Sequence, residues 1–271
     1  MIQKIAETSD FIKSKISFIP EIGIILGSGL GGLAEKITDK VSFAYSDIPN
    51  FPISTVEGHS GKLIFGKLGG KNVVAMQGRF HYYEGYGMKE VTFPVRVMKF
   101  LGVKYLCVSN AAGGLNPTFK VGDIMIITDH INYFPENPLR GKNFNELGVR
   151  FPDMSKAYHP ELIKIAEAVA LKEGIAIRKG IYIGSTGPTL ETQAEYRLFK
   201  LFGADATGMS TVPEVIVANH QEMKCFGLSV ITNVGEKENL DEETTHDEVQ
   251  NVAGSVEPIM TKLIIGLIEH L

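Results

Sequence analysis

Charged and polar side chains gather in one short segment that directly follows an apolar run. The segment is Gln77-Gly78-Arg79-Phe80-His81-Tyr82-Tyr83-Glu84-Gly85, and it comes after the apolar residues 72–76. Arg79 offers a planar guanidinium for two phosphate oxygens, His81 offers another donor, and Tyr83 offers a ring or hydroxyl to a sugar. A surface pair between Arg79 and Glu84, with a purely structural His81, is the alternative.

Two segments of small residues also follow apolar runs. Gly27-Ser28-Gly29-Leu30-Gly31-Gly32 comes after residues 22–26, and Ser109-Asn110-Ala111-Ala112-Gly113-Gly114-Leu115 ends another run. Backbone N–H groups in such turns can bind an anion, and the first turn is expected at a helix start. Taken alone, each segment is explained equally well as an ordinary turn with no ligand. Two such turns after parallel strands predict one crevice at the carboxyl ends of those strands.

The first glycine segment also permits a different class of protein. Gly27, Gly29 and Gly32 fit the spacing of a dinucleotide-binding turn, and Asp47 lies where a ribose-binding acid is expected. This pattern keeps a NAD(P)-binding oxidoreductase open. The residues after Asp47 are Ile48-Pro49-Asn50, which do not begin a helix and so break the expected βαβ unit.

Further polar candidates stand beside predicted helices and strands, and each has a structural alternative. Glu191 begins an apolar-periodic helix, where the helix dipole alone favours an acid. Ser210 is an anion donor or a helix cap, and Met209 is a sugar platform or core filler. Asn233 follows a predicted strand. It is either a turn residue or a residue that offers an acceptor and donors to a heterocycle. His246 lies in an acidic stretch that is ordinarily solvated.

The elements that must position these residues alternate between strands and helices, which indicates an α/β fold. Strands are predicted at 22–26, 62–68, 72–76, 105–109, 124–128 and 226–232. Helices are predicted at 160–172, 191–202, 211–223 and 252–270, with an amphipathic N-terminal segment. No linker divides the chain, so we expect one domain over residues 1–271, with a central mixed, mostly parallel twisted sheet flanked by helices.

Composition excludes several partners. The formal net charge is −4 at pH 7, which gives no general attraction to nucleic acid or anionic lipid, and no membrane span is expected. Cys107 and Cys225 lie in apolar runs and are predicted to be buried free thiols, and no export signal is recognised, so we expect a cytoplasmic protein. No cluster has zinc spacing, so no metal is expected.

Taken together, the segments at 27–31, 78–85, 110–115, 187–192 and 208–214 resemble the trimeric purine nucleoside phosphorylases over nearly the whole chain. The resemblance implies phosphorolysis of purine nucleosides, with phosphate as co-substrate and no cofactor. It implies the following site residues. Phosphate is bound by Ser28, Arg79, His81, Ala111 and Ser210. The sugar is bound by His59, Tyr83, Met209, His246 and a neighbouring subunit's Phe151, in a homotrimer. The base is bound by Ala112, Gly113, Leu190, Glu191, Thr207, Gly208, Thr232 and Asn233.

Among these residues, His81, Glu191, Asn233 and His246 are expected to act in catalysis. Asn233 would hydrogen-bond the base as its ring gains charge, and Glu191 would accept from the ring N–H of a 6-oxopurine such as hypoxanthine or guanine. Leu190 and Thr207 stand where some relatives carry an aromatic residue and a valine, which makes the base pocket slightly more polar. Xanthosine and methylthioadenosine are the alternative nucleosides. The methylthioadenosine subgroup has an acid in place of Asn233.

Overall fold

The sheet at the centre of the molecule organises everything else. The computed structural model describes residues 1–53, 60–235 and 244–271, and in these residues the strands form one nine-stranded mixed sheet in the order β2-β3-β4-β1-β5-β8-β7-β6-β9. The strands are β1 (Ile22–Leu26), β2 (Thr38–Ala44), β3 (Lys62–Leu68), β4 (Lys71–Gln77), β5 (Tyr105–Gly114), β6 (Ile124–Asn132), β7 (Ile177–Gly184), β8 (Ala206–Gly208) and β9 (Lys224–Val234).

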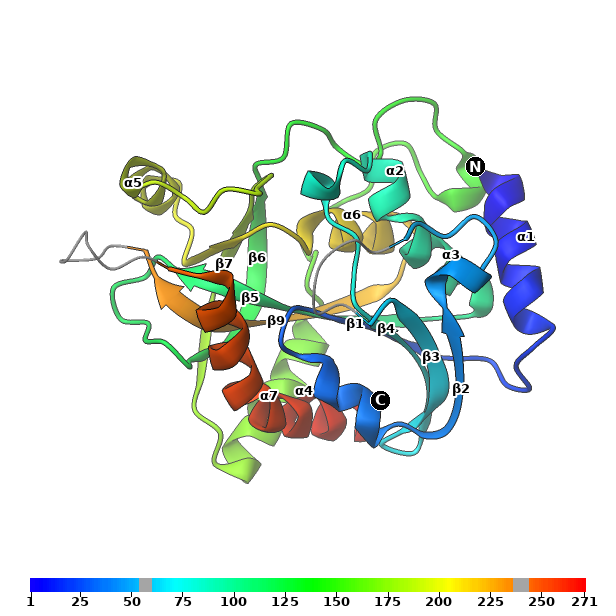
Figure 1. Ribbon diagram of the computed structural model, residues 1–271, viewed down its shortest axis with the longest axis horizontal. Coiled ribbons are helices and arrows are strands. Elements are labelled where there is room, and N and C mark those ends of the chain that lie inside the picture. The colour runs from blue at the N-terminus through cyan, green and yellow to red at the C-terminus, as the bar shows by residue number, and fades with distance from the viewer. Residues whose placement is uncertain (54–59, 236–243) are drawn as a thin grey trace.

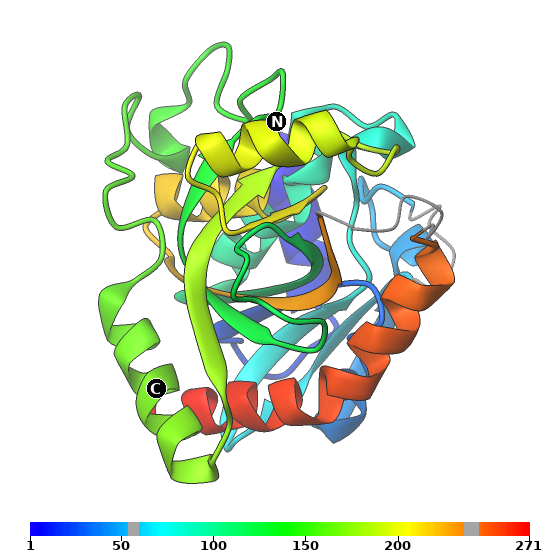
Figure 2. The ribbon, with the colours of Figure 1, turned by 90° about the vertical axis from the view of Figure 1, so that its left-hand side faces the viewer.

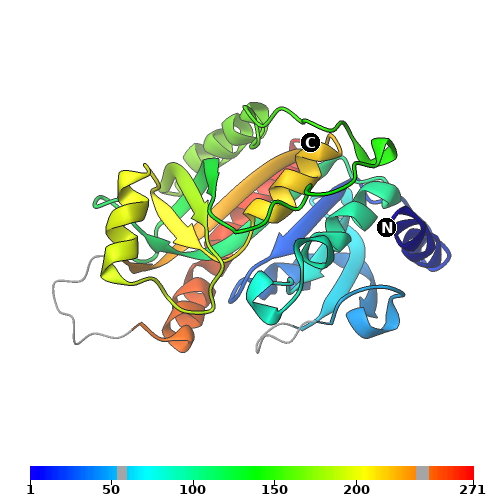
Figure 3. The same cartoon turned by 90° about the horizontal axis from the view of Figure 1, so that it is seen from above.

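Helices cover both faces of this sheet (Figure 1). They are α1 (Ile2–Lys13), α2 (Met88–Val91), α3 (Phe93–Leu101), α4 (Pro160–Glu173), α5 (Gln193–Leu201), α6 (Val212–His220) and α7 (His246–Glu269), with short 3₁₀ turns η1 (Gly31–Lys36), η2 (Tyr45–Asp47), η3 (Tyr82–Glu84) and η4 (Asn145–Leu147). The helices α1, α3 and α6 pack on one face, and α4 and α7 pack on the other. Figure 3 shows α1 at one end of the molecule and α5 at the other.

Alternating side chains of the inner strands divide between two hydrophobic cores. In β1, Ile24 joins the core under α4 and α7, whereas the next residue, Ile25, joins the core under α1, α3 and α6. In β4, Val73 and Val74 divide in the same way. Successive side chains of a strand point to opposite faces, so an apolar run with no polar alternation marks a strand that is buried on both sides. The predicted α/β single-domain fold with a mixed sheet and flanking helices is confirmed.

One half of the sheet closes on itself, which the sequence did not predict. Strand β5 pairs in parallel with β9 and antiparallel with β8, and β8, β7, β6 and β9 complete the ring. The register between β5 and β9 shifts between Ala112 and Gly113, where an irregularity of this kind bends a strand. Figure 2 shows β7 and β9 curving around this closed half. The bend directs the end of β5 toward the polar residues discussed below.

Several local predictions need correction. Residues 110–114 are not a turn, because β5 continues through them and pairs with β9. The turn after β1 leads into the 3₁₀ turn η1 and not into an α-helix. Asp47 lies in η2, and the neighbouring β2 pairs antiparallel with β3, so the βαβ unit required by the oxidoreductase alternative is not formed. Strands β2, β7 and β8 and helices α2 and α3 were not predicted from the sequence.

By length and apolar composition alone, α7 is able to cross a membrane. Its apolar side chains are nevertheless used inside the protein: Met260, Leu263 and Leu267 are fully buried and belong to the core under α4. The helix also carries Pro258 in its interior. We therefore interpret α7 as a core helix.

Candidate active site

The predicted site residues converge on one cavity of about 620 Å³. The loop after β1, the segment after β4, the ends of β5, β8 and β9, and the start of α7 form its wall. The predicted residues that line it are Ser28, Arg79, His81, Tyr83, Ala111, Ala112, Gly113, Leu190, Glu191, Thr207, Gly208, Met209, Ser210, Thr232, Asn233 and His246. Of the other two, His59 lies outside the described residues, and Phe151 lies elsewhere on this chain.

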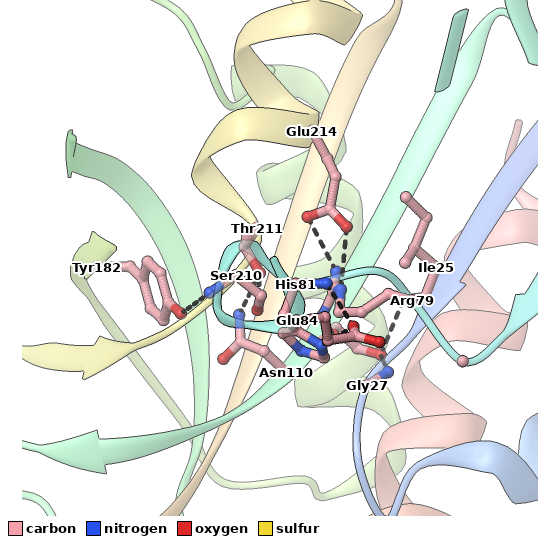
Figure 4. A network of polar contacts seen from close by, with 12 residues as sticks. Ile25, Gly27, Arg79, His81, Glu84, Asn110, Tyr182, Ser210, Thr211 and Glu214 are labelled. Atoms are coloured by element: carbon pink, nitrogen blue, oxygen red, sulfur yellow. Dashed lines mark hydrogen bonds and ion pairs between the residues drawn. The ribbon is translucent and has the colours of Figure 1, made fainter. Parts of the chain in front are cut away.

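Arg79 is held by a carboxylate that was not assigned from the sequence. The Arg79 side chain is 1% exposed, and its Nε and Nη2 atoms donate to the two carboxylate oxygens of Glu214 at 3.0 and 3.2 Å (Figure 4). Its Nη1 donates to the backbone oxygen of Ser109 at 2.6 Å. The fork expected to hold two phosphate oxygens therefore faces Glu214, and the proposed surface partner, Glu84, bonds to His81 instead.

His81 is buried and fixed by Glu84. Glu84 Oε1 accepts from the backbone N–H of His81 at 2.7 Å and lies 3.2 Å from its Nδ1. Burial lowers the pKa of His81 below its usual value, with the hydrogen bond to Glu84 acting in the opposite direction. A neutral ring facing a carboxylate donates from Nδ1, because the carboxylate only accepts. This tautomer leaves the acceptor lone pair on Nε2, where a neutral ring accepts a hydrogen bond. The role of His81 as a donor to phosphate stays a prediction.

Ser210 is positioned by a strained turn and not by helix capping. The turn is closed by a hydrogen bond from Val212 N to Ser210 O at 2.7 Å, and its central residue, Thr211, has φ 71° and ψ −53°. A γ-turn with positive φ is rare for a β-branched residue and costs free energy. The Thr211 hydroxyl accepts from Asn110 Nδ2 at 2.9 Å and lies 3.1 Å from the Ser210 hydroxyl. The strain is thus sustained by buried polar contacts at the start of α6.

Ser28 is carried by a loop that passes very close to β5. A Cβ atom on Gly27 would lie 2.7 Å from Ser109 O and 2.9 Å from Asn110 Cα, so only glycine fits there. The Gly27 N–H donates to the Ser109 hydroxyl at 3.4 Å. The predicted anion-binding turn is therefore tied to β5 by its first residue, and Ser28, the next residue, lines the cavity.

A second polar group of the cavity is built around Glu191. Its Oε1 accepts from the Thr207 hydroxyl at 2.7 Å and from the Ser185 hydroxyl at 3.4 Å. Glu191 precedes α5, whose N-cap is Thr192, so the expectation that Glu191 begins this helix was wrong. Nearby, the Thr232 hydroxyl donates to Asn233 Oδ1 at 3.2 Å. A carboxylate and an amide with oriented partners are suited to read the edge of a heterocycle.

Tyr83, Met209 and His246 provide a less polar stretch of wall. Tyr83 stacks on His81 with ring centroids 4.7 Å apart, and both Tyr83 and Met209 lie against the Cα of Gly187. His246 is the first residue of α7, and its Nε2 lies 2.8 Å from Gln250 Nε2 one turn later. These side chains are suited to contact a sugar through a ring, a thioether and an imidazole.

Phe151 is 87% exposed and lines a different hollow, beside Arg150 and His130. The Arg150 guanidinium carbon lies 5.7 Å from the centre of its ring. A large apolar side chain so exposed is available to contact another chain. The structure of one chain does not bring Phe151 into its own cavity.

Five supporting residues were not predicted from the sequence: Glu214, Glu84, Asn110, Thr211 and Tyr182. The Tyr182 hydroxyl accepts from the Ser210 backbone N–H at 3.4 Å, and Glu214 meets an arginine 135 positions earlier in the chain. Only the Glu84 pairing had a local signal, since His81 and Glu84 are three residues apart and form a capping box. Among residues 1–53, 60–235 and 244–271, no group of three His, Cys, Asp or Glu side chains could hold a metal ion.

Known proteins that are similar to this chain are phosphorylases. A family model described as "Phosphorylase superfamily" matches residues 21–269. Purine nucleoside phosphorylase 1 of Geobacillus stearothermophilus is 52% identical over 267 residues, which cover 98% of this chain and 97% of that protein. Two structures of Schistosoma mansoni purine nucleoside phosphorylase cover 100% of this chain. The complex with inosine is 43% identical with a TM-score of 0.94 over 97% of that chain, and the complex with adenosine is 45% identical with a TM-score of 0.95 over 98%.

Proposed function

Because the chain belongs to the purine nucleoside phosphorylases of the phosphorylase superfamily, and so splits purine nucleosides with inorganic phosphate, we propose that the 620 Å³ cavity is where this reaction takes place. One observation carries the proposal. A single cavity combines an arginine–serine–histidine group with a separate carboxylate–amide group, which are the groups needed for an anion and for a purine edge.

Phosphate is proposed to bind among Ser28, Arg79, His81 and Ser210, with the backbone of Ala111. Since Glu214 offsets the charge of Arg79, much of the attraction must come from hydroxyl and N–H donors and from the N-terminus of α6 beside Ser210. Because burial lowers the pKa of His81, the neutral ring accepts a hydrogen bond from a phosphate hydroxyl, which orients the nucleophile.

The base is proposed to bind between Glu191 and Asn233, with Thr232, Ala112 and Gly113 nearby. As phosphate oxygen forms its bond to the anomeric carbon, the bond from that carbon to the purine nitrogen breaks and its electron pair moves into the base. Positive charge then builds on the sugar, where the phosphate anion stabilises it, and negative charge builds on the purine, where Asn233 donates a hydrogen bond.

A preference for inosine and guanosine is the finer part of the proposal. Glu191 accepts the N1–H of a 6-oxopurine, whereas adenine presents an unprotonated N1 and would leave polar groups mismatched. Asn233 also distinguishes the chain from the methylthioadenosine pattern, which has an acid there. A similar protein has been crystallised with adenosine, which is a 6-aminopurine nucleoside. The preference of this chain for 6-oxopurines must therefore be measured directly.

The experiment is an assay of free base from inosine, guanosine, xanthosine and adenosine, with and without phosphate. We expect one ribose 1-phosphate per hypoxanthine, no release without phosphate, and kcat/KM for adenosine at least about tenfold lower than for inosine, which corresponds to about 1.4 kcal/mol. Equal release without phosphate would contradict phosphorolysis, and equal kcat/KM for adenosine would contradict only the base preference. The cytoplasmic location and the lack of a further cofactor stay predictions.

A further inference from the structure

A buried tyrosine lies between the two residues that read the base. Tyr196, on α5, is 6% exposed, and its ring packs in a small core with Leu115, Ile183 and Phe199. Its hydroxyl leaves this apolar surrounding and accepts from Asn233 Nδ2 at 3.5 Å, and the negative charge of Glu191 acts on the same hydroxyl. Neither the motifs of the sequence nor the lining of the cavity singled out this residue.

The direction of each hydrogen bond in this group follows from the carboxylate. The negative charge of Glu191 favours an orientation in which the hydroxyl hydrogen of Tyr196 points toward this carboxylate and away from the Asn233 amide nitrogen. The oxygen of Tyr196 is then left with lone pairs, which accept from the Asn233 amide nitrogen at the observed contact. Burial, followed by the nearby Glu191 charge, raises the pKa of Tyr196 to about 12, which keeps the phenol protonated and able to donate.

The amide oxygen of Asn233 also has a partner, which favours the same orientation of the amide. The Thr232 hydroxyl lies 3.2 Å from Asn233 Oδ1 and 3.4 Å from the backbone oxygen of Ala112, and donation to the nearer Oδ1 gives the amide oxygen and nitrogen each a matching partner. A flipped amide would place its oxygen against the lone pairs of Tyr196. One N–H of Asn233 remains to be offered to a purine, beside a Glu191 carboxylate whose Oε1 is already held by Thr207.

We propose that Tyr196 is a positioning residue that holds the Asn233 amide nitrogen at its hydroxyl, so that a donor faces the purine 6-position and 6-oxopurines are preferred to 6-aminopurines. The proposal rests on the proposed function of this cavity. This relay joins the amide nitrogen of Asn233, on β9, to the hydroxyl of Tyr196, on α5, and the charge of Glu191, in the loop before α5, acts on that hydroxyl.

The test is Tyr196→Phe, which removes only the hydroxyl and keeps the packed ring. We expect the ratio of kcat/KM for inosine to that for adenosine to fall at least fivefold, while the KM for phosphate changes less than twofold. Tyr133→Phe is the matched control, since the Tyr133 ring packs on the same helix, 5.3 Å from Phe199, but does not line the cavity. It should leave the ratio unchanged.

A second measurement separates positioning from general structural damage. In an Asn233→Ala background the relay has no amide to orient, so Tyr196→Phe should lower inosine turnover much less than it does in the wild type. An unchanged inosine-to-adenosine ratio in Tyr196→Phe, or the same loss in both backgrounds, would overturn the inference. If the wild-type chain releases no hypoxanthine from inosine with phosphate, the proposed function itself fails, which is a distinguishable result.

Discussion

Among single residues, the buried ion pair of Arg79 and Glu214 dominates the electrostatics of the proposed phosphate site. Both side chains are at most 3% exposed, and they meet through two hydrogen bonds. Separating a buried ion pair by removing one partner commonly costs about 3 to 5 kcal/mol, because a charge is left without compensation. A phosphate ion beside Arg79 supplies such compensation, so the pair and the ligand should be energetically linked.

Replacing Glu214 with Gln therefore yields a specific expectation. In buffer without phosphate, the free energy of unfolding should fall by about 3 kcal/mol, because Arg79 loses its anionic partner. Phosphate should then raise the thermal midpoint of the variant more than that of the wild type. Glu161→Gln is the control, since Glu161 contacts Lys224 at an exposed site where an ion pair contributes little. Equal phosphate-dependent shifts in wild type and Glu214→Gln would contradict the link.

At the scale of elements, the close contact between the loop after β1 and strand β5 positions Ser28. The atoms within 3 Å of a Cβ placed on Gly27 are backbone atoms of Ser109 and Asn110, which cannot turn aside as a flexible side chain can. Gly27→Ala must therefore push the loop away from β5, at a cost of about 1 to 3 kcal/mol in stability. Ser28 should move with the loop.

For Gly27→Ala we expect the KM for phosphate to rise about tenfold, equivalent to about 1.4 kcal/mol, with a smaller change in the KM for inosine. Initial-rate kinetics with each substrate varied in turn measure both. Gly254→Ala is a matched control within α7, because the nearest atom to its Cβ is Gly29 O at 3.9 Å and alanine favours a helix. An unchanged phosphate KM in Gly27→Ala would show that the loop position does not matter for phosphate.

The sequence predicted the segments that form the site, but it did not predict how distant strands pair. The two glycine segments and the polar segment after β4 were recognised because local spacing marks the end of a buried strand, and all three do meet at the cavity. The closure of β5 on β9 was not predictable, since it depends on pairing between strands more than 100 positions apart. Residues 110–114 looked like a turn because small side chains favour turns, but their pairing with β9 makes them strand.

The supporting side chains could not be predicted either, because their contacts also join positions far apart in the sequence. Glu214, Asn110 and Thr211 act through partners that only the folded chain brings together. A positive φ at Thr211 contradicts local propensity, since a β-branched residue avoids that conformation. Such departures from local preference occur where tertiary contacts impose them, and here they lie at the cavity.

In the whole molecule, Phe151 is a large apolar side chain that is exposed and lies outside the cavity of its own chain. We propose that the chain forms a homotrimer in which Phe151 of each subunit contacts the sugar end of a neighbour's cavity, which agrees with its 87% exposure and its place outside its own cavity. The mass of the assembly in solution, measured by sedimentation, should then be three times that of the chain.

Complementation between two inactive chains tests this arrangement more sharply. Arg79→Ala retains an intact Phe151, and Phe151→Ala retains an intact Arg79. Mixed assemblies should therefore contain sites with Arg79 from one subunit and Phe151 from the next, and their phosphorolysis rate should exceed the mean of the two separate variants. A rate equal to that mean, or a monomeric mass, would contradict the shared site.

One cavity is proposed to place phosphate and purine at two distinct polar groups. A crystal structure of the chain with phosphate and hypoxanthine tests it most directly. We expect phosphate within hydrogen-bond distance of the Ser28 and Ser210 hydroxyls. We expect hypoxanthine with its N1 toward Glu191 and its six-position oxygen toward Asn233 Nδ2. Phosphate bound away from both serines, or hypoxanthine with its six-position turned away from Asn233, would contradict it.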